Sequence, residues 1–223
     1  MCGRFTLTAD PKHIEKRFGA RFISSHWEPT YNAAPSQMLP VILGRNPLGN
    51  SPREIVLARW GFRPTWASNR MMQINARIET AKEKRMFRDA FVSNHCLILA
   101  DGYYEWKTEN RKKRPYRFVM RDRQPFAMAG IWERPNFDDE PATFAILTTK
   151  ANELAAEVHD RMPVILPIGY EHRWLKETGY GRQLNFPLSY PADEMRSYPV
   201  SMKVNSASFN EPDAILPLER AIS

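Results

Sequence analysis

The chain has 223 residues, of which 43% are hydrophobic and 26% are charged, as in an ordinary globular protein. Its 2 cysteines are too few for a disulfide framework or a cysteine-rich zinc site. No apolar run approaches the ~18 residues of a membrane span. Charged side chains among the first twenty residues argue against the apolar segment of a signal peptide. We therefore expect a cytoplasmic protein of a reducing compartment that is not embedded in a membrane and needs no metal or cofactor.

The charge is basic, with 32 Lys and Arg against 25 Asp and Glu, a net charge of +7. A basic excess favours a polyanionic partner, because Lys and Arg release the counterions of phosphates. The alternative is that the excess only aids solubility. Two stretches concentrate the charge: residues 107–123 hold eight basic side chains against two acidic ones, and residues 77–88 hold five against two.

Alternating polar and apolar residues predict a short strand at residues 4–8. A helix is predicted to follow it, with Asp10 as the N-cap, Pro11 at the first helical position and Gly19 at the end. Residues 26–40, rich in Pro and Asn, are predicted to form a loop, and residues 44–52 a turn-rich connection. Further helices are predicted at residues 76–90 (with Ile78, Met86 and Ala90 inward and a cationic outer face), 152–158 and near 171–178.

Strands outnumber helices in this reading. Apolar or alternating runs predict them at residues 39–43, 54–62, 96–100, 103–107, 114–120, 126–132, 143–149, 164–166 and near 200–204. Most connections are too short for crossovers between parallel strands. The predicted fold is therefore α+β, a single domain over residues 1–223 with a largely antiparallel, curled or barrel-like sheet and peripheral helices.

Cys2 is the most informative position for chemistry. A small second residue normally allows removal of the initiator Met, which would leave an amine and a thiol on adjacent carbons. The α-amine has a pKa of about 7.7–8.0, so a useful fraction is unprotonated at neutral pH. Such a pair captures an aldehyde as a Schiff base and then closes a five-membered thiazolidine, a ring closure favoured by proximity. The alternative is an incidental cysteine on a mobile terminus, although a strand starting at once would anchor it.

Glu105 and His159 are the candidates for moving protons. Glu105 is flanked by aromatic residues, and partial burial there would raise its pKa into a range useful for acid–base catalysis. It could equally be a solvent-facing strand residue paired with a lysine. His159 lies at a helix-to-strand junction, where its alternative role is a C-terminal cap. Asn75 offers an amide that could orient a hydroxyl or oxyanion. Cysteine–histidine peptidase chemistry is a competing use of Cys2 and His159, without any signal for an oxyanion hole.

Five ordered motifs carry a resemblance to a known family. They are Met1-Cys2-Gly3-Arg4-Phe5, Tyr31-Asn32-Ala33-Ala34-Pro35, Asn75-Ala76-Arg77-Ile78-Glu79, Asp101-Gly102-Tyr103-Tyr104-Glu105-Trp106 and His159-Asp160-Arg161-Met162-Pro163. Through them the chain resembles the SRAP proteins (SOS response-associated peptidase), most closely the bacterial members. The resemblance extends from Cys2 to about Val204.

The resemblance implies a sensor of abasic sites in single-stranded DNA that forms a thiazolidine crosslink and shields the strand during the DNA damage response. It implies that Cys2 is the reacting residue, that Glu105 is the acid–base group, and that Asn75 and His159 complete the catalytic set. The implied DNA contacts are Arg4, Arg77 and Arg161, to which we add Arg85 and Trp66. The peptidase in the family's name is tied to removal of the residue before Cys2. We expect a monomer, associated with the nucleoid when bound to DNA.

The chemistry of the residues agrees with this implication. An abasic deoxyribose is mostly a closed hemiacetal, so a proton-moving group such as Glu105 must open it before the Cys2 amine attacks. A Schiff base alone would promote strand cleavage, whereas closure by the thiol removes the imine. Two other functions remain as alternatives: a non-covalent single-strand DNA-binding module with an incidental Cys2, and a thiol peptidase acting on other proteins.

Overall fold

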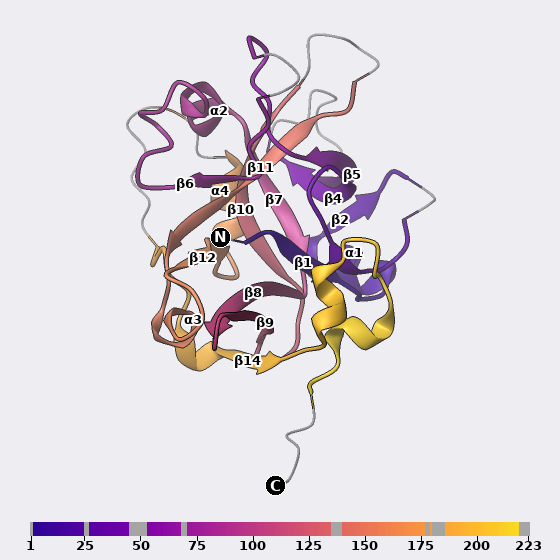
Figure 1. The fold of residues 1–223 in the computed structure, drawn as a ribbon. Coiled ribbons are helices and arrows are strands. Elements are labelled where there is room, and N and C mark those ends of the chain that lie inside the picture. Colours follow the sequence, from indigo (N-terminus) through magenta and orange to yellow (C-terminus); the bar gives the residue numbers. More distant parts are fainter. Residues whose placement is uncertain are drawn as a thin grey trace, which may run out of the picture.

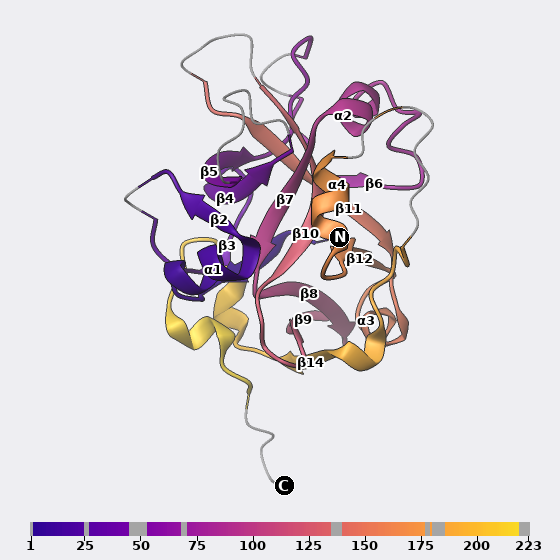
Figure 2. The ribbon, with the colours of Figure 1, turned by 180° about the vertical axis from the view of Figure 1, so that it is seen from behind.

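The computed structural model describes residues 2–24, 27–44, 53–67, 71–134, 140–176, 179 and 186–218. Strands dominate these residues and form two sheets, with short helices at the periphery (Figures 1 and 2). Residues 45–52 of the predicted turn-rich connection and His26 lie outside the described residues.

The smaller sheet contains the first strand of the chain. Its order is β14-β9-β8-β1-β3, and all its pairings are antiparallel. The strands are β1 (Arg4–Leu7), β3 (Thr30–Ala33), β8 (Gly102–Glu109), β9 (Lys112–Met120) and β14 (Met195–Pro199). Strands β8 and β9, predicted at residues 103–107 and 114–120, form a hairpin whose two-residue loop is Asn110-Arg111.

The larger sheet closes on itself. Its main order is β12-β11-β10-β7-β4-β5-β2, and β11 also pairs in parallel with β5. Strands β11, β10, β7, β4 and β5 therefore form a closed ring, which confirms the barrel-like prediction. The strands are β2 (Ala20–Phe22), β4 (Met38–Leu43), β5 (Arg53–Trp60), β6 (Asn75–Arg77), β7 (His95–Ala100), β10 (Phe126–Glu133), β11 (Thr143–Lys150), β12 (Arg161–Pro163) and β13 (Ile165–Leu166).

Local signals in the sequence set the first helix. Helix α1 (Pro11–Phe18) begins after Asp10, whose carboxylate accepts from the backbone of Lys12 at 2.9 Å, and ends at Gly19 with a φ of 57°. Both caps were predicted. The other helices are α2 (Arg88–Ser93), α3 (Glu153–Ala156) and α4 (Tyr170–Lys176), with 3-10 turns η1 (Ala192–Glu194), η2 (Met202–Asn205) and η3 (Pro212–Ile215).

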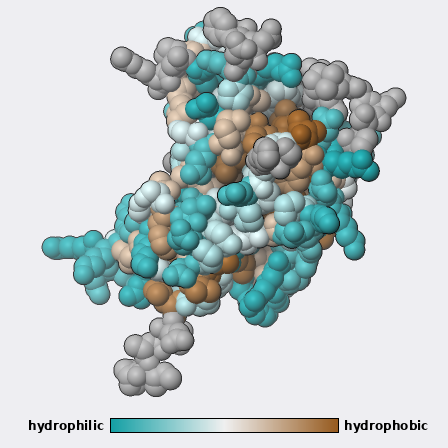
Figure 3. Space-filling model, turned by 90° about the vertical axis from the view of Figure 1, so that its right-hand side faces the viewer, coloured by the Kyte–Doolittle hydropathy of each residue, from teal (hydrophilic) through white to brown (hydrophobic). Residues whose placement is uncertain are grey.

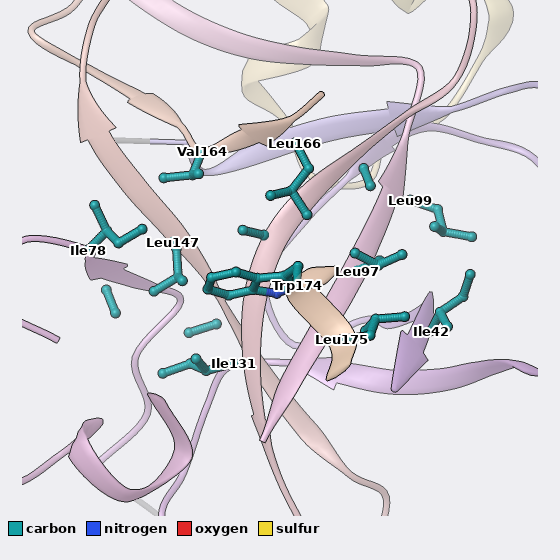
Figure 4. Packing of buried hydrophobic residues seen from close by; sticks show 14 of the residues in the cluster. Ile42, Ile78, Leu97, Leu99, Ile131, Leu147, Val164, Leu166, Trp174 and Leu175 are labelled. Atoms are coloured by element: carbon teal, nitrogen blue, oxygen red, sulfur yellow. The ribbon is translucent and has the colours of Figure 1, made fainter. Parts of the chain in front are cut away.

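The core lies on both faces of the closed sheet. Strand β7 is buried at every position, as its continuous apolar run predicts. Its Leu97 and Leu99 pack on one face with residues of α1, α2 and α4, around the fully buried Trp174 (Figure 4). On the opposite face Cys96 and Ile98 pack with residues of the smaller sheet. Cys96 is thus a small buried residue of the core.

Three predicted elements are wrong. Residues 76–90 are not one helix: Asn75–Arg77 pairs with β11, the backbone N–H of Ile78 donates to Thr148, and a series of turns follows until α2. Sheet pairing overrides helix propensity there, while Ile78 and Ala90 are buried as expected. The predicted 26–40 loop contains β3, which forms because β1 offers it an edge.

The third error concerns the C-terminal strand. The strand β14 precedes residues 200–204, and Met202–Asn205 forms the 3-10 turn η2, begun by the Ser201 side chain accepting from Lys203.

On the surface, hydrophilic side chains cover much of one face, with smaller hydrophobic areas between them (Figure 3). Among the described residues, no helix is both long and apolar enough to span a bilayer.

Candidate active site

Cys2 is a fully buried residue two positions before β1, and it belongs to the core between the two sheets. Its thiol approaches the carbonyl oxygen of Arg4, with 3.8 Å between sulfur and oxygen. Burial, and then the charge of Glu105, raise the pKa of the Cys2 thiol well above its ordinary value. Cys2 is therefore a fixed, protonated thiol rather than a cysteine on a loose terminus.

A buried ion pair holds the strand that carries Cys2. The carboxylate of Asp101 accepts from the Thr6 hydroxyl at 2.5 Å, from the Thr8 hydroxyl at 2.7 Å and from the Ala9 backbone at 3.0 Å. On its other side it pairs with Arg117 at 3.1 Å. Asp101 thereby fixes the far end of β1 and the turn into α1. The strand reaches the site with a defined position.

Asn75 lies on β6 and contacts Cys2 directly. Its side-chain Nδ2 donates to the Cys2 carbonyl oxygen at 2.8 Å. Its Oδ1 is buried and accepts no hydrogen bond from the described residues. Parallel pairing with β11 brings Asn75 opposite Ile146, which places this short strand beside the N-terminus. One end of the amide thus orients Cys2, and the other end can accept from a ligand.

Glu105 lies on β8, and its side chain is nearly buried, with 3% of the residue exposed. Burial raises its pKa above the ordinary value, and positive charge nearby, including that of His159, opposes the shift. The neighbouring hydroxyl of Tyr103 is also buried; burial first, then the charges of Cys2 and Glu105, raise the pKa of Tyr103. The interpretation of Glu105 as an exposed residue paired with a lysine is wrong for this structure.

His159 follows α3 and faces the same hollow as Glu105. Its ring Nδ1 lies 3.0 Å from the backbone N–H of Arg161 and 2.9 Å from a carboxylate oxygen of Asp160. The first contact requires a lone pair on Nδ1 and the second requires a proton. The backbone donor is fixed, whereas the Asp160 carboxylate is exposed and can turn away, so the bond from Arg161 sets the orientation of the ring.

An open hollow of about 340 Å³ joins Glu105 and His159, and its lining also includes Trp106, Lys113 and Asn205. Strand β1 pairs with β8 and lies above it in Figures 1 and 2. The structure thus brings together the four catalytic candidates of the sequence: Asn75 bonds to Cys2, and Glu105 interacts electrostatically with both Cys2 and His159. Asn75 and Glu105 come from strands, Cys2 from the segment just before β1, and His159 from the loop after α3.

Arg4 is bonded to Asn205 of the hollow and is largely engaged within the fold. Its guanidinium donates to Asn32 at 2.9 Å and to the backbone carbonyls of Val204 at 2.8 Å and Asn205 at 3.2 Å. Burial lowers its pKa somewhat, and the group is half-buried. These bonds hold η2 against the site. Three of its five donors are used, which leaves two for a ligand.

Arg161 is held even more firmly. Its two terminal nitrogens form a fork with Glu79, at 2.8 and 2.9 Å, and one of them also donates to the Thr148 carbonyl at 2.6 Å. Only 12% of its side chain is exposed. Burial raises the pKa of Glu79, but the bonds from Arg161 outweigh this and the net pKa is lowered. Through its backbone, Arg161 also fixes the ring of His159.

The other predicted DNA contacts are accessible. Arg77 is exposed on β6, two residues after Asn75. The guanidinium of Arg85 lies over the ring of Trp66, 4.4 Å from its centroid, and 45% of Trp66 is exposed. The structure therefore brings Arg85 and Trp66 together as a stacked pair on the surface. Among the described residues, no group of three or more His, Cys, Asp or Glu side chains could hold a metal ion.

Sequence reasoning missed several residues of the site. Glu79 and Tyr103 stand inside motifs already quoted, so those motifs were the available signal. Asn205 had no such signal: it accepts from the Trp106 ring N–H at 2.6 Å across 99 positions of the chain, and only the fold brings it there. Lys113 was noted only as part of a basic stretch, yet it lines the hollow.

Comparison with known proteins gives a consistent result. A family model described as SOS response associated peptidase (SRAP) matches residues 1–207. The abasic site processing protein YoqW of Bacillus subtilis (strain 168) is 40% identical over 227 residues, covering 96% of this chain and 99% of that protein. The abasic site processing protein YedK of Escherichia coli (strain K12) is 32% identical over 163 residues, covering 71% of this chain and 73% of that protein. A crystal structure of a protein from Bacteroides thetaiotaomicron is similar with a TM-score of 0.81 and 26% identity, covering 97% of this chain and all 100% of that one.

Proposed function

Because this chain belongs to the SRAP (SOS response-associated peptidase) family, we propose that it processes abasic sites in single-stranded DNA by crosslinking itself to them through Cys2. The relatives described above are named abasic site processing proteins, which supports the substrate class. One observation carries the mechanism: the buried Cys2 at the chain start is bonded to Asn75 and lies within the electrostatic reach of Glu105.

The first step opens the sugar. A closed deoxyribose hemiacetal needs a proton on its ring oxygen, while its hydroxyl proton is taken up. Glu105 suits this task because burial raises its pKa, so the carboxyl can donate a proton and then recover it. His159 lines the same hollow and is proposed as a second proton-moving group. The product is the ring-opened aldehyde.

The second step is bond formation at C1′. After removal of Met1, the Cys2 amine attacks the aldehyde carbon, water leaves, and an imine forms. The Cys2 sulfur then adds to the imine carbon while the thiol proton passes to nitrogen, which closes the thiazolidine. Asn75 fixes the Cys2 carbonyl, so amine and thiol are presented from a constant position. Ring closure consumes the imine before β-elimination cleaves the strand.

DNA binding is proposed to rest on phosphate contacts. Arg77 is exposed beside Asn75, and the Arg85–Trp66 pair offers a cation over a ring on which a base can stack. Arginine contacts to phosphates are independent of sequence, which suits a lesion that has lost its base. Arg4 and Arg161 are proposed to contribute from the rim, with much of their bonding capacity already used by the fold.

A peptidase acting on other proteins is less well supported. Thiol peptidases need a thiolate, hence a lowered cysteine pKa, whereas burial and Glu105 raise the pKa of the Cys2 thiol. The peptidase of the family description is instead proposed to be removal of the residue before Cys2.

The test separates amine from thiol. The purified wild-type protein should lack Met1 by intact mass and form a heat-stable adduct with an abasic oligonucleotide. The Cys2→Ser variant keeps the amine but has a weaker ring-closing nucleophile. It should form an imine that borohydride traps, form no stable adduct without reduction, and nick the strand by β-elimination.

The control substitutes the other cysteine. Cys96 is buried in the same core, so Cys96→Ser removes a thiol without touching the N-terminus, and it should crosslink like the wild type. A heat-stable unreduced adduct from Cys2→Ser would refute the thiazolidine mechanism. Full crosslinking by a protein with a blocked N-terminus would refute the role of the amine.

A further inference from the structure

The β8–β9 hairpin continues beyond the site as a basic arm. Past Glu105 it carries Lys107, Arg111, Lys112, Lys113 and Arg114 against the single acidic residue Glu109. The carboxylate of Glu109 lies 3.8 Å from Lys107 and 3.5 Å from Arg114, so its charge is already matched by the arm itself. None of the ion pairs found among the described residues involves Arg111 or Lys112 at the tip.

The arm is connected to the site. Lys113 lines the hollow that contains Glu105 and His159, so the basic side chains begin at the catalytic pocket and run outward. Strand β1 pairs with β8 only as far as Tyr104. Beyond that point β8 is paired within the hairpin by β9, and the arm projects below the N-terminal end of β1 (Figure 1).

The backbone at the tip provides an independent observation. The loop residues Asn110 and Arg111 have φ angles of 49° and 64°. Two-residue hairpins with two positive φ angles favour Asn-Gly, because glycine adopts the second position without steric conflict. Here the second position holds an arginine. A strained backbone that presents a charged side chain at a loop tip is typical of a functional position.

We propose that the tip of the β8–β9 hairpin, through Arg111, binds a DNA phosphate several nucleotides away from the lesion. This inference rests on the proposed function for the identity of the DNA. Strand β8 continues for four residues past Glu105 before the loop, so the tip lies roughly 15–17 Å from Glu105 at about 3.3 Å per residue. At about 3.4 Å of rise per nucleotide of stacked strand, the contact falls about four to five nucleotides from the abasic site.

The chain contains a matched control. Arg123 also has a positive φ, 58°, and is also exposed, but it lies beyond the opposite end of β9. The nine residues of that strand place the two arginines about 27 Å apart or more. Arg111→Gly and Arg123→Gly therefore remove the same charge from the same backbone conformation at two different places. Both should raise the temperature of unfolding, because glycine relieves the strain.

The experiment measures non-covalent affinity by fluorescence anisotropy, before crosslinking, over a range of salt concentrations. The oligonucleotides carry an abasic site with ten nucleotides on each side, or with one side shortened to two. On the long oligonucleotide, Arg111→Gly should weaken binding by about three- to tenfold at low salt and reduce the salt slope by about 0.7 to 0.9. Arg123→Gly should bind like the wild type, and Arg111→Lys should keep most of the affinity.

One side of the oligonucleotide is the side that the hairpin tip contacts. Shortening that side should remove the difference in affinity between Arg111→Gly and the wild type. The proposal is overturned if Arg111→Gly binds the long oligonucleotide like the wild type, if Arg123→Gly weakens binding equally, or if the loss persists with both shortened oligonucleotides. Failure of the proposed function looks different, because the wild type would then form no crosslink. The hairpin contact would still be measured on an undamaged oligonucleotide of the same length.

Discussion

Replacing Glu105 by Gln removes one ionisable proton and little else. The two side chains have the same shape, and the amide can keep hydrogen bonds that the carboxyl makes. Glu105 is 3% exposed, so water has little access to take over its role. We therefore expect Glu105→Gln to bind abasic DNA like the wild type and to crosslink slowly.

The size of the effect follows from what a positioned acid–base group contributes. Such a group accelerates a reaction by about 10²- to 10⁴-fold, equivalent to about 2.7–5.4 kcal/mol of the barrier. The pH dependence should change as well. In the wild type, the rate falls at acid pH as the Cys2 amine is protonated, and at higher pH as Glu105, whose pKa is raised by burial, ionises. Glu105→Gln should lose the second fall and keep the first.

Although Glu105→Gln should slow crosslinking, it should raise the stability of the folded protein at neutral pH. A carboxyl with a raised pKa in the folded state binds its proton more tightly there than in the unfolded chain. Its contribution is therefore fully present below the ordinary value of 4.5 and is lost as pH rises through the raised pKa of Glu105. Glutamine is never charged, so Glu105→Gln should be more stable than the wild type at neutral pH, by denaturant unfolding, and the difference should vanish near pH 4.

The matched control is Glu109→Gln, on the same strand but half-buried and paired with Lys107 and Arg114. At saturating DNA it should crosslink at the wild-type rate in single-turnover gels. If Glu105→Gln also reacts at that rate, the acid–base role does not belong to Glu105 and passes to His159. If Glu105→Gln is less stable than the wild type at neutral pH, burial does not raise the pKa of Glu105 as described above.

Two further substitutions test the site and its DNA contacts. Asn75→Ala leaves the buried Cys2 carbonyl without its 2.8 Å donor, a loss of about 1–3 kcal/mol, and we expect single-turnover crosslinking to slow by about 5- to 150-fold; an unchanged rate would mean that Asn75 does not position Cys2. Arg77→Ala should weaken non-covalent binding equally for all sequences and reduce the salt slope by about 0.7, measured by salt titration; a loss confined to certain bases would contradict a phosphate contact.

Local patterns in the sequence determined most of the strands and the first helix. The caps of α1 and the buried run of β7 depend on neighbours in the chain, so they could be predicted without the fold. The segment at residues 76–90 could not. Its composition favours a helix, but the backbone of residues 75–78 pairs with β11, a partner about 70 positions away. Such long-range pairing decides a conformation whenever local preference is weak.

The chemistry of the site was determined by residue types, and its geometry by tertiary structure. An amine and a thiol on adjacent carbons of Cys2 can capture an aldehyde whatever fold the chain adopts. The raised pKa of Glu105, in contrast, exists only because the two sheets bury it beside Cys2 and His159. The fork between Glu79 and Arg161 likewise spans 82 positions of the chain. Burial and distance are properties of packed strands, and no motif encodes them alone.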